Sequence, residues 1–147
     1  MKAQEFRDRL PDHLRPRLPP EWRAFRTASR FSYVQFWYGP QAFHFEASPY
    51  YEREIYEVGL HFESRDKALN ATLHAAFDRR FAEIRHSLGA DVFLEQWDRG
   101  WHKLYRCLPF PARRYDDGLL DAVVSELARQ IALLQPMLDE ALAAPGE

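Results

Sequence analysis

Two histidines and several carboxylates recur at alternate positions in two neighbouring segments of the chain. The segment REIYEVGLHFE places Glu57, His61 and Glu63 on one side of a strand, because side chains along a strand alternate between its two faces. The preceding segment QAFHFE carries His44 and Glu46 in the same alternating pattern. If the two strands pair, these side chains share one face of a sheet, where they could bind a divalent metal ion or perform acid–base chemistry.

A polar surface in contact with water is the competing interpretation of this pattern. Which residues lie opposite one another depends on strand register, and a shift of two residues keeps every side chain on the same face. We therefore assign no metal, no cofactor and no catalytic residue from the sequence. An enzyme that uses the histidines and glutamates of this face stays open as one alternative.

The position of Gly59 between Glu57 and His61 favours a small-molecule site at this strand. Glycine has no side chain, so a ligand or another backbone could approach closely there. Tryptophans on neighbouring strands would supply the apolar lining that pockets usually have. The predicted ligand-binding residues are Trp37, His44, Glu57, Gly59, His61 and Trp97.

Two further groups of residues could recognise a partner. Aromatic residues on strands either stack on planar ligands or bases, or pack in the core, and at a period of two the core is the more frequent place. Basic residues on helices and loops either face water or bind phosphates and acidic partners. The aromatic group is Tyr33, Trp37, Trp97, Trp101 and Tyr105. The basic group is Arg79, Arg80, Arg85, Arg99, Lys103, Arg106, Arg113 and Arg114.

Composition excludes several classes of protein. The chain has 147 residues with 20 lysines and arginines against 22 acidic residues, and its net charge of −2 does not favour nucleic-acid binding. A single cysteine rules out a disulfide scaffold and a multi-cysteine zinc site. The first residues, MKAQEFRDRL, lack the apolar core of a signal peptide, and no apolar run approaches the roughly 18 residues of a membrane span. We expect a cytoplasmic protein without membrane contact.

The elements that must position these residues follow from hydrophobic periodicity. Alternation predicts strands at residues 31–38, 41–46, 53–63, 92–97 and 101–108. Apolar spacings of three and four predict a helix that begins at Ser64 and stops at Gly89, and another after Asp116 and Asp117. With a short N-terminal helix, the order is α-β-β-β-α-β-β-α. This order predicts a two-layer α+β fold, with a mostly antiparallel five-stranded sheet and helices on one face.

The chain is predicted to be a single domain over residues 1–147. Residues 1–30 are basic and rich in proline, and we expect them to form an arm beside a core of residues 31–143. The last helix carries an apolar stripe that would pack on its own sheet or pair with a second copy to give a homodimer. The stripe consists of Leu120, Val124, Leu127, Ile131, Leu134, Leu138 and Leu142.

Four pieces of the sequence resemble a bacterial domain family without assigned catalytic residues. They are Phe43-His44, Arg53 to Phe62, Ile84 to Gly89, and Leu94 with Trp97, within residues 31–140. Members of that family are often fused to, or found beside, restriction-type nucleases and other DNA-associated proteins. The resemblance implies an accessory domain of a bacterial defence system that contacts nucleic acid or a nuclease.

These observations lead to three alternative functions. The first is a small intracellular module that binds a protein or a small molecule. The second is the accessory domain that the resemblance implies. The third is a small enzyme that uses the His/Glu face of the sheet.

Overall fold

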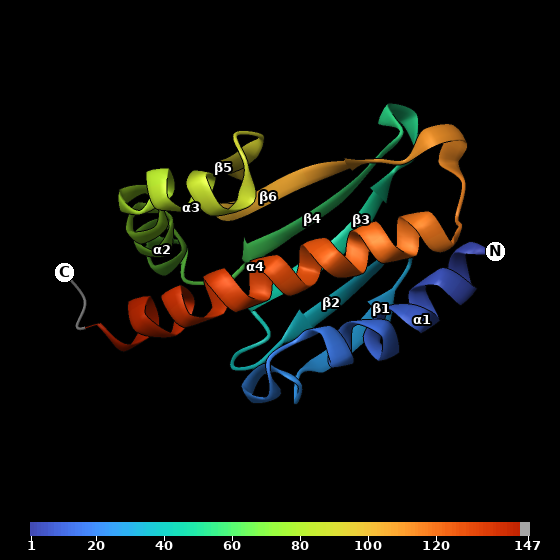
Figure 1. Ribbon diagram of the computed structural model, residues 1–147. Coiled ribbons are helices and arrows are strands. Elements are labelled where there is room, and N and C mark those ends of the chain that lie inside the picture. Colours follow the sequence, from blue (N-terminus) through green and yellow to red (C-terminus); the bar gives the residue numbers. More distant parts are fainter. Residues whose placement is uncertain (145–147) are drawn as a thin grey trace.

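The computed structural model describes residues 1–144, and its α+β class confirms the prediction. The helices are α1 (Ala3–Leu14), α2 (Lys67–Arg79), α3 (Phe81–Leu88) and α4 (Asp117–Ala143). The strands are β1 (Arg26–Arg30), β2 (Tyr33–Trp37), β3 (Phe43–Tyr50), β4 (Ile55–Phe62), β5 (Val92–Asp98) and β6 (Trp101–Pro109). The long helix α4 lies across the sheet, between α1 on one side and α2 on the other (Figure 1).

The strands form one antiparallel sheet in the order β1-β2-β3-β4-β6-β5. Between β4 and β5 the chain passes through α2 and α3, so β5 takes the edge outside β6. The hairpin from β5 to β6 turns through Arg99 and Gly100, which have φ angles of 47° and 79°. Two consecutive residues with positive φ form the tight turn whose twist matches that of the strands.

The sheet has six strands rather than the predicted five, because residues 26–30 form β1. Their sequence, RTASR, has no apolar alternation, and most of their side chains are exposed. The strand forms by backbone pairing with β2, from Arg26 opposite Trp37 to Arg30 opposite Tyr33. The first 30 residues, which we expected to form an arm, also supply part of the core. These core residues are Phe6, Leu10, Leu14, Leu18 and Phe25.

The side chains of strand β4 alternate between the two faces of the sheet, with apolar residues on the face covered by helices and the polar residues on the other. The strand's fully buried apolar side chains are Tyr56, Val58, Leu60 and Phe62. The ring of Phe6 in α1 lies 5.4 Å from that of Tyr56, and the ring of Phe77 in α2 lies 5.3 Å from that of Phe62. Because Tyr56 and Phe62 share one face of β4, both helices cover that face. The intervening side chains, among them His61, project from the other face.

The helix predicted from Ser64 to Gly89 is in fact two helices that meet at Arg80. Arg80 has φ −107° and ψ 12°, which is outside the helical range. Helix α2 begins after Asp66 rather than after Ser64, because the Asp66 carboxylate accepts the N–H of Leu69 at 3.1 Å.

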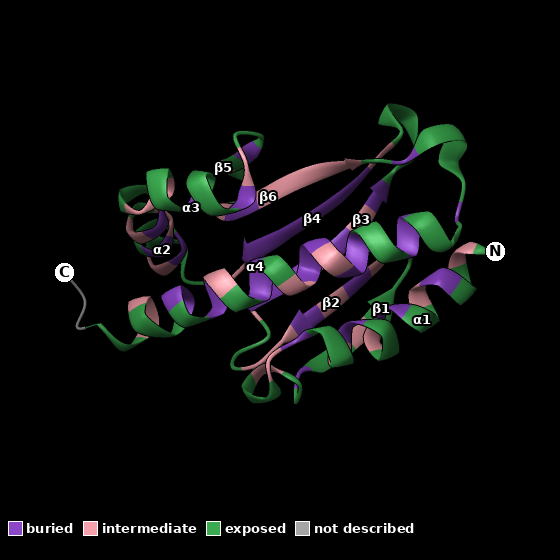
Figure 2. Ribbon diagram, viewed as in Figure 1, coloured by how far each residue is buried: buried purple, intermediate pink, exposed green. Residues whose placement is uncertain are grey.

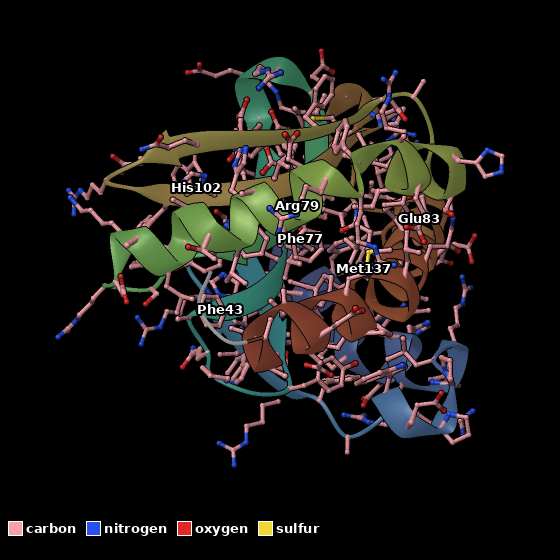
Figure 3. The ribbon with its side chains drawn as sticks, turned by 90° about the vertical axis from the view of Figure 1, so that its left-hand side faces the viewer. Phe43, Phe77, Arg79, Glu83, His102 and Met137 are labelled. Carbon is pink, nitrogen blue, oxygen red and sulfur yellow. The ribbon has the colours of Figure 1, made fainter. Side chains whose placement is uncertain are left out.

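Burial along the helices follows their apolar spacing. The predicted stripe of α4 is buried within the chain from Leu120 to Leu138, with Leu127, Ile131 and Leu134 fully covered and Leu142 partly buried. Buried and exposed residues alternate along the helix (Figure 2). In α2, Phe77 points into the core, whereas Arg79 lies on the outer side (Figure 3). The stripe that could have paired with a second copy is thus used within one chain.

Candidate metal centre

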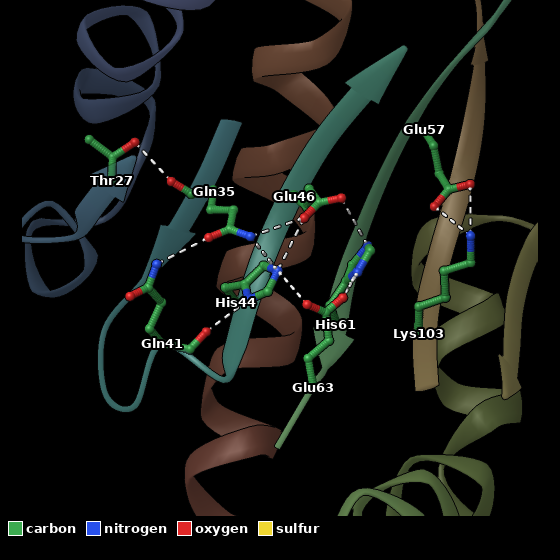
Figure 4. A network of polar contacts seen from close by, with 9 residues as sticks. All are labelled: Thr27, Gln35, Gln41, His44, Glu46, Glu57, His61, Glu63 and Lys103. Carbon is green, nitrogen blue, oxygen red and sulfur yellow. Dashed lines mark hydrogen bonds and ion pairs between the residues drawn. The ribbon is translucent and has the colours of Figure 1, made fainter. Parts of the chain in front are cut away.

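The register of β3 and β4 brings the polar residues of the two strands onto one face. His44 lies opposite His61, and Glu46 lies opposite Gly59. Directly opposite residues in an antiparallel pair project to the same side, so the side chains of His44, Glu46 and His61 converge. Glu63 follows the end of β4 and joins them (Figure 4). The strand pairing on which the sequence hypothesis depended is therefore present.

Four side chains form a compact group that we call the His/Glu centre: His44, Glu46, His61 and Glu63. One ligand atom from each lies within 4.8 Å of the others. His44 Nε2 is 3.2 Å from Glu46 Oε1 and 3.8 Å from Glu63 Oε1. His61 Nδ1 is 2.9 Å from Glu63 Oε2, and His61 Nε2 is 3.9 Å from Glu46 Oε2. The four side chains are at most 17% exposed, so the group lies largely out of water.

The imidazole of His44 is held in one orientation by its neighbours. Its Nδ1 lies 2.8 Å from the carbonyl oxygen of Gln41, and since a carbonyl only accepts, Nδ1 carries the hydrogen. In the neutral ring, Nε2 then presents its lone pair to the centre. The Gln35 side chain accepts from Gln41 at 3.2 Å and donates to Glu46 at 3.3 Å. Such outer partners orient metal ligands in many proteins.

The sequence analysis did not include Gln35 and Gln41 among the site residues. Gln35 is the only amide in the aromatic segment FSYVQFWY, and a lone polar residue in such a strand is the feature that could have indicated its role. Gln41 contacts His44 through its backbone carbonyl, which no side-chain pattern reports.

The charges of the centre shift the pKa values of two members in opposite directions. Burial lowers the pKa of His44, but its hydrogen bond to Glu46 and the charges of Glu63 and Glu46 outweigh this, so the pKa is raised. Burial raises the pKa of Glu46, but the hydrogen bond to His44 and the charges of both histidines outweigh this, so the pKa is lowered. The metal-free centre therefore favours an imidazolium–carboxylate pair.

Glu57, one of the predicted ligand residues, belongs to a separate buried ion pair. Lys103 Nζ lies 3.0 and 3.2 Å from its two carboxylate oxygens. The ammonium also lies 4.4 Å from the ring centre of Tyr105 and 5.2 Å from that of Trp97. Burial lowers the pKa of Lys103, but the hydrogen bond to Glu57 and the charge of Glu57 outweigh this effect, so the pKa is raised. Because Lys103 neutralises Glu57, this carboxylate is not part of the His/Glu centre.

The interpretation of this face as a polar surface in contact with water is wrong for its central residues. Glu57 and His61 are each 3% exposed. Gly59, between them, makes room for a neighbouring strand: an added Cβ would lie 2.5 Å from the Cβ of Tyr105 and 2.6 Å from the carbonyl oxygen of Leu104. Of the two possibilities at Gly59, close approach by another backbone is the one realised.

Of the two predicted tryptophans, Trp97 contacts a member of the His/Glu centre, and Trp37 lies on β2. The ring of Trp97 packs edge-on against that of His61, with centroids 6.0 Å apart, and the residue is 41% exposed. Trp37 is half-buried on β2, opposite Arg26. A third aromatic residue, Tyr33, lines the cleft described next.

An open cleft of about 530 Å³ lies beside the His/Glu centre. Two members of the centre, His44 and Glu63, form part of its wall. The other lining residues are Arg30, Tyr33, Gln35, Gln41, Ala42 and Arg65. The centre is therefore accessible from one side even though its side chains are largely buried.

Several members of the basic group named from the sequence are already paired. Lys103 binds Glu57, and Arg106 binds Asp91 at 3.0 Å and also Glu126. The two arginines of the cleft were not in that group. These contacts reduce the number of free cations available for a phosphate or an acidic partner.

No family model, curated protein or solved structure matches the chain. The resemblance to nuclease-associated bacterial domains is therefore untested and stays a prediction. Within residues 1–144, no helix has both the length and the apolar character needed to cross a membrane.

Proposed function

We propose that the His/Glu centre binds one divalent transition-metal ion and that this ion forms part of a ligand-binding site. The observation that carries the proposal is the convergence of two imidazoles and two carboxylates, with His44 Nε2 directed inward by the Gln41 carbonyl. Imidazole and carboxylate are the ligands taken by zinc, iron, manganese, cobalt and nickel.

The spacing of the four groups suits such an ion. An octahedral ion with ligands at about 2.0–2.1 Å has neighbouring ligand atoms roughly 2.9 Å apart and opposite ones roughly 4.1 Å apart. His44 Nε2 lies 3.2 Å from an oxygen of Glu46 and 3.8 Å from one of Glu63, and the four ligand atoms, one from each residue, lie within 4.8 Å of one another. Side-chain rotations that shorten the longest of these separations would bring all four ligands to bonding distance.

Charge balance also favours a dication. Two buried carboxylates without compensation are unfavourable, because low-dielectric surroundings disfavour isolated charge. A proton on His44 compensates part of this charge when no metal is bound. A divalent ion would balance both carboxylates at once and leave the two histidines neutral.

A bound ion would serve the cleft that opens onto His44 and Glu63. An octahedral ion with four protein ligands keeps two positions, which a polar ligand or water could occupy. This supports the first function expected from the sequence, a small binding module. The second candidate is a small metal-dependent enzyme, favoured by the same opening, in which the ion polarises a ligand or lowers the pKa of a bound water.

Titration of the chelator-treated protein with Co²⁺ or Zn²⁺ tests the proposal. We expect one ion per chain by calorimetry, and more than about 100-fold weaker binding in His44→Ala and His61→Ala, since even the outer partners of metal ligands contribute roughly 10–100-fold. His86→Ala, which alters an exposed histidine of α3, is the matched control and should bind normally. Equal affinity in His61→Ala and His86→Ala would exclude the proposed centre. Hydrolysis of p-nitrophenyl esters by the loaded protein tests the second candidate.

A further inference from the structure

We infer that the ligand of this centre is a small molecule with an anionic phosphate or carboxylate group. One oxygen of the group would bind the metal ion, and the remaining oxygen of a carboxylate, or oxygens of a phosphate, would accept hydrogen bonds from Arg30 and Arg65. This inference rests on the metal site proposed above, and it concerns what the site recognises.

The two arginines lie in the cleft without internal partners. Arg30 ends β1 opposite Tyr33, and Arg65 follows Glu63 by two residues, so the two reach the same cleft from opposite ends of the strands. Within residues 1–144, no carboxylate lies within 4.0 Å of either guanidinium. Many other arginines of the chain are paired, namely Arg9, Arg15, Arg17, Arg80, Arg99, Arg106 and Arg129.

The charge of the cleft with a bound ion is positive. Glu46 and Glu63 balance a dication, and the histidines are neutral as ligands, so Arg30 and Arg65 leave an excess of two positive charges. Glu63 is the one acidic residue among the described lining residues. A cleft of one sign attracts ligands of the opposite sign, and the planar guanidinium matches the oxygens of carboxylates and phosphates.

The remaining lining favours the same ligand class. The hydroxyl of Tyr33 and the side-chain amide of Gln41 can donate hydrogen bonds, and anionic oxygens accept them. The volume of about 530 Å³ is within the range of roughly 300–1,000 Å³ that is typical of small-molecule sites. A small anion therefore fits better than an extended polymer.

The experiment uses the Co²⁺-loaded protein with phenyl phosphate and benzoate as probes. Binding of either probe to the ion is followed by the visible absorption of cobalt, which responds to its ligands. We expect Arg30→Gln and Arg65→Gln each to weaken probe binding by about tenfold or more, because each removes charge-assisted hydrogen bonds. Arg26→Gln is the matched control: it lies on the same strand and face as Arg30 but does not line the cleft.

The cobalt titration, made before any probe is added, separates the two hypotheses. Normal cobalt binding with weakened probe binding in both variants supports the inference, and the better of the two probes identifies the anionic group. With normal cobalt binding, the inference is overturned if neither probe binds or if both variants match Arg26→Gln. It is also overturned if calorimetry shows that the metal-free protein binds the probes equally well. Absence of cobalt binding overturns the proposed metal site and this inference with it. Circular dichroism of each single variant verifies that it is folded.

Discussion

His44 and His61 lie directly opposite each other on β3 and β4, with ring centroids 5.3 Å apart and ring planes inclined by 22°. Two imidazolium charges at this distance would repel each other, whereas one proton or one metal ion can be shared among the surrounding carboxylates. If the centre binds a metal ion through both histidines, as proposed, the ion would compete with the proton on His44.

Glu46→Gln should destabilise the metal-free protein more at pH 5.5 than at pH 8.5. The raised pKa of His44 gives stability that is present below its unfolded value of 6.5 and is lost as pH rises through the folded value. The lowered pKa of Glu46 gives stability that is present above 4.5 and is lost as pH falls through the folded value. Both contributions coexist between about pH 4.5 and 6.5.

Urea unfolding at the two pH values measures this difference. At pH 5.5 we expect Glu46→Gln to lower the free energy of unfolding by about 1.5–3 kcal/mol, the range for hydrogen bonds to charged groups. Glu52→Gln, at an exposed position, should have little effect at either pH. An effect of Glu46→Gln that is equal at both pH values would contradict the ion pair with His44.

Gly59→Ala should destabilise the fold, because its Cβ would collide with Tyr105 and with the carbonyl of Leu104. Overpacking of this kind typically lowers the free energy of unfolding by about 1–3 kcal/mol. Gly39→Ala is the control, since no heavy atom lies within 4 Å of its added Cβ. Chemical denaturation of both variants tests the contact, and equal stability would mean that β4 and β6 do not pair this closely.

Lys103→Met should lower the free energy of unfolding by about 3–5 kcal/mol, because it leaves the buried Glu57 carboxylate without its partner. The double variant Glu57→Leu/Lys103→Met removes both charges and should recover most of this loss. The two single variants and the double variant form a cycle that is measured by denaturant unfolding. Additive losses in the double variant would show that the two side chains do not interact.

Phe77→Ala should lower the free energy of unfolding by about 3–5 kcal/mol, as expected for deletion of a buried aromatic ring. Phe77 is 1% exposed and packs on Phe62. Phe31→Ala is the control, because Phe31 is 88% exposed and surface substitutions usually change stability by less than about 0.5 kcal/mol. Thermal or urea unfolding distinguishes the two, and a loss below about 1 kcal/mol in Phe77→Ala would contradict the packing of α2 on the sheet.

The α+β class and the shared face of the candidate ligands were predictable, because both depend on local periodicity. Alternation along a strand requires that Glu57 and His61 point to the same side, whatever the strand pairs with. The class follows from the order of helical and extended segments. Strand β1 was not predictable in this way, because residues 26–30 have no apolar alternation and become a strand only by pairing with β2.

The composition of the site depended on contacts between distant parts of the chain. The sequence by itself determined that His44 and Glu46 share one face of their strand and that Glu57 and His61 share one face of theirs, since alternation is a property of each strand alone. Only the tertiary structure decided that these two faces coincide, that Lys103 of β6 neutralises Glu57 and that Tyr105 fills the space at Gly59. The physical reason is that strand order and register set these neighbours. The alternating sequence pattern does not distinguish registers that differ by two residues, because each of them leaves every side chain on the same face.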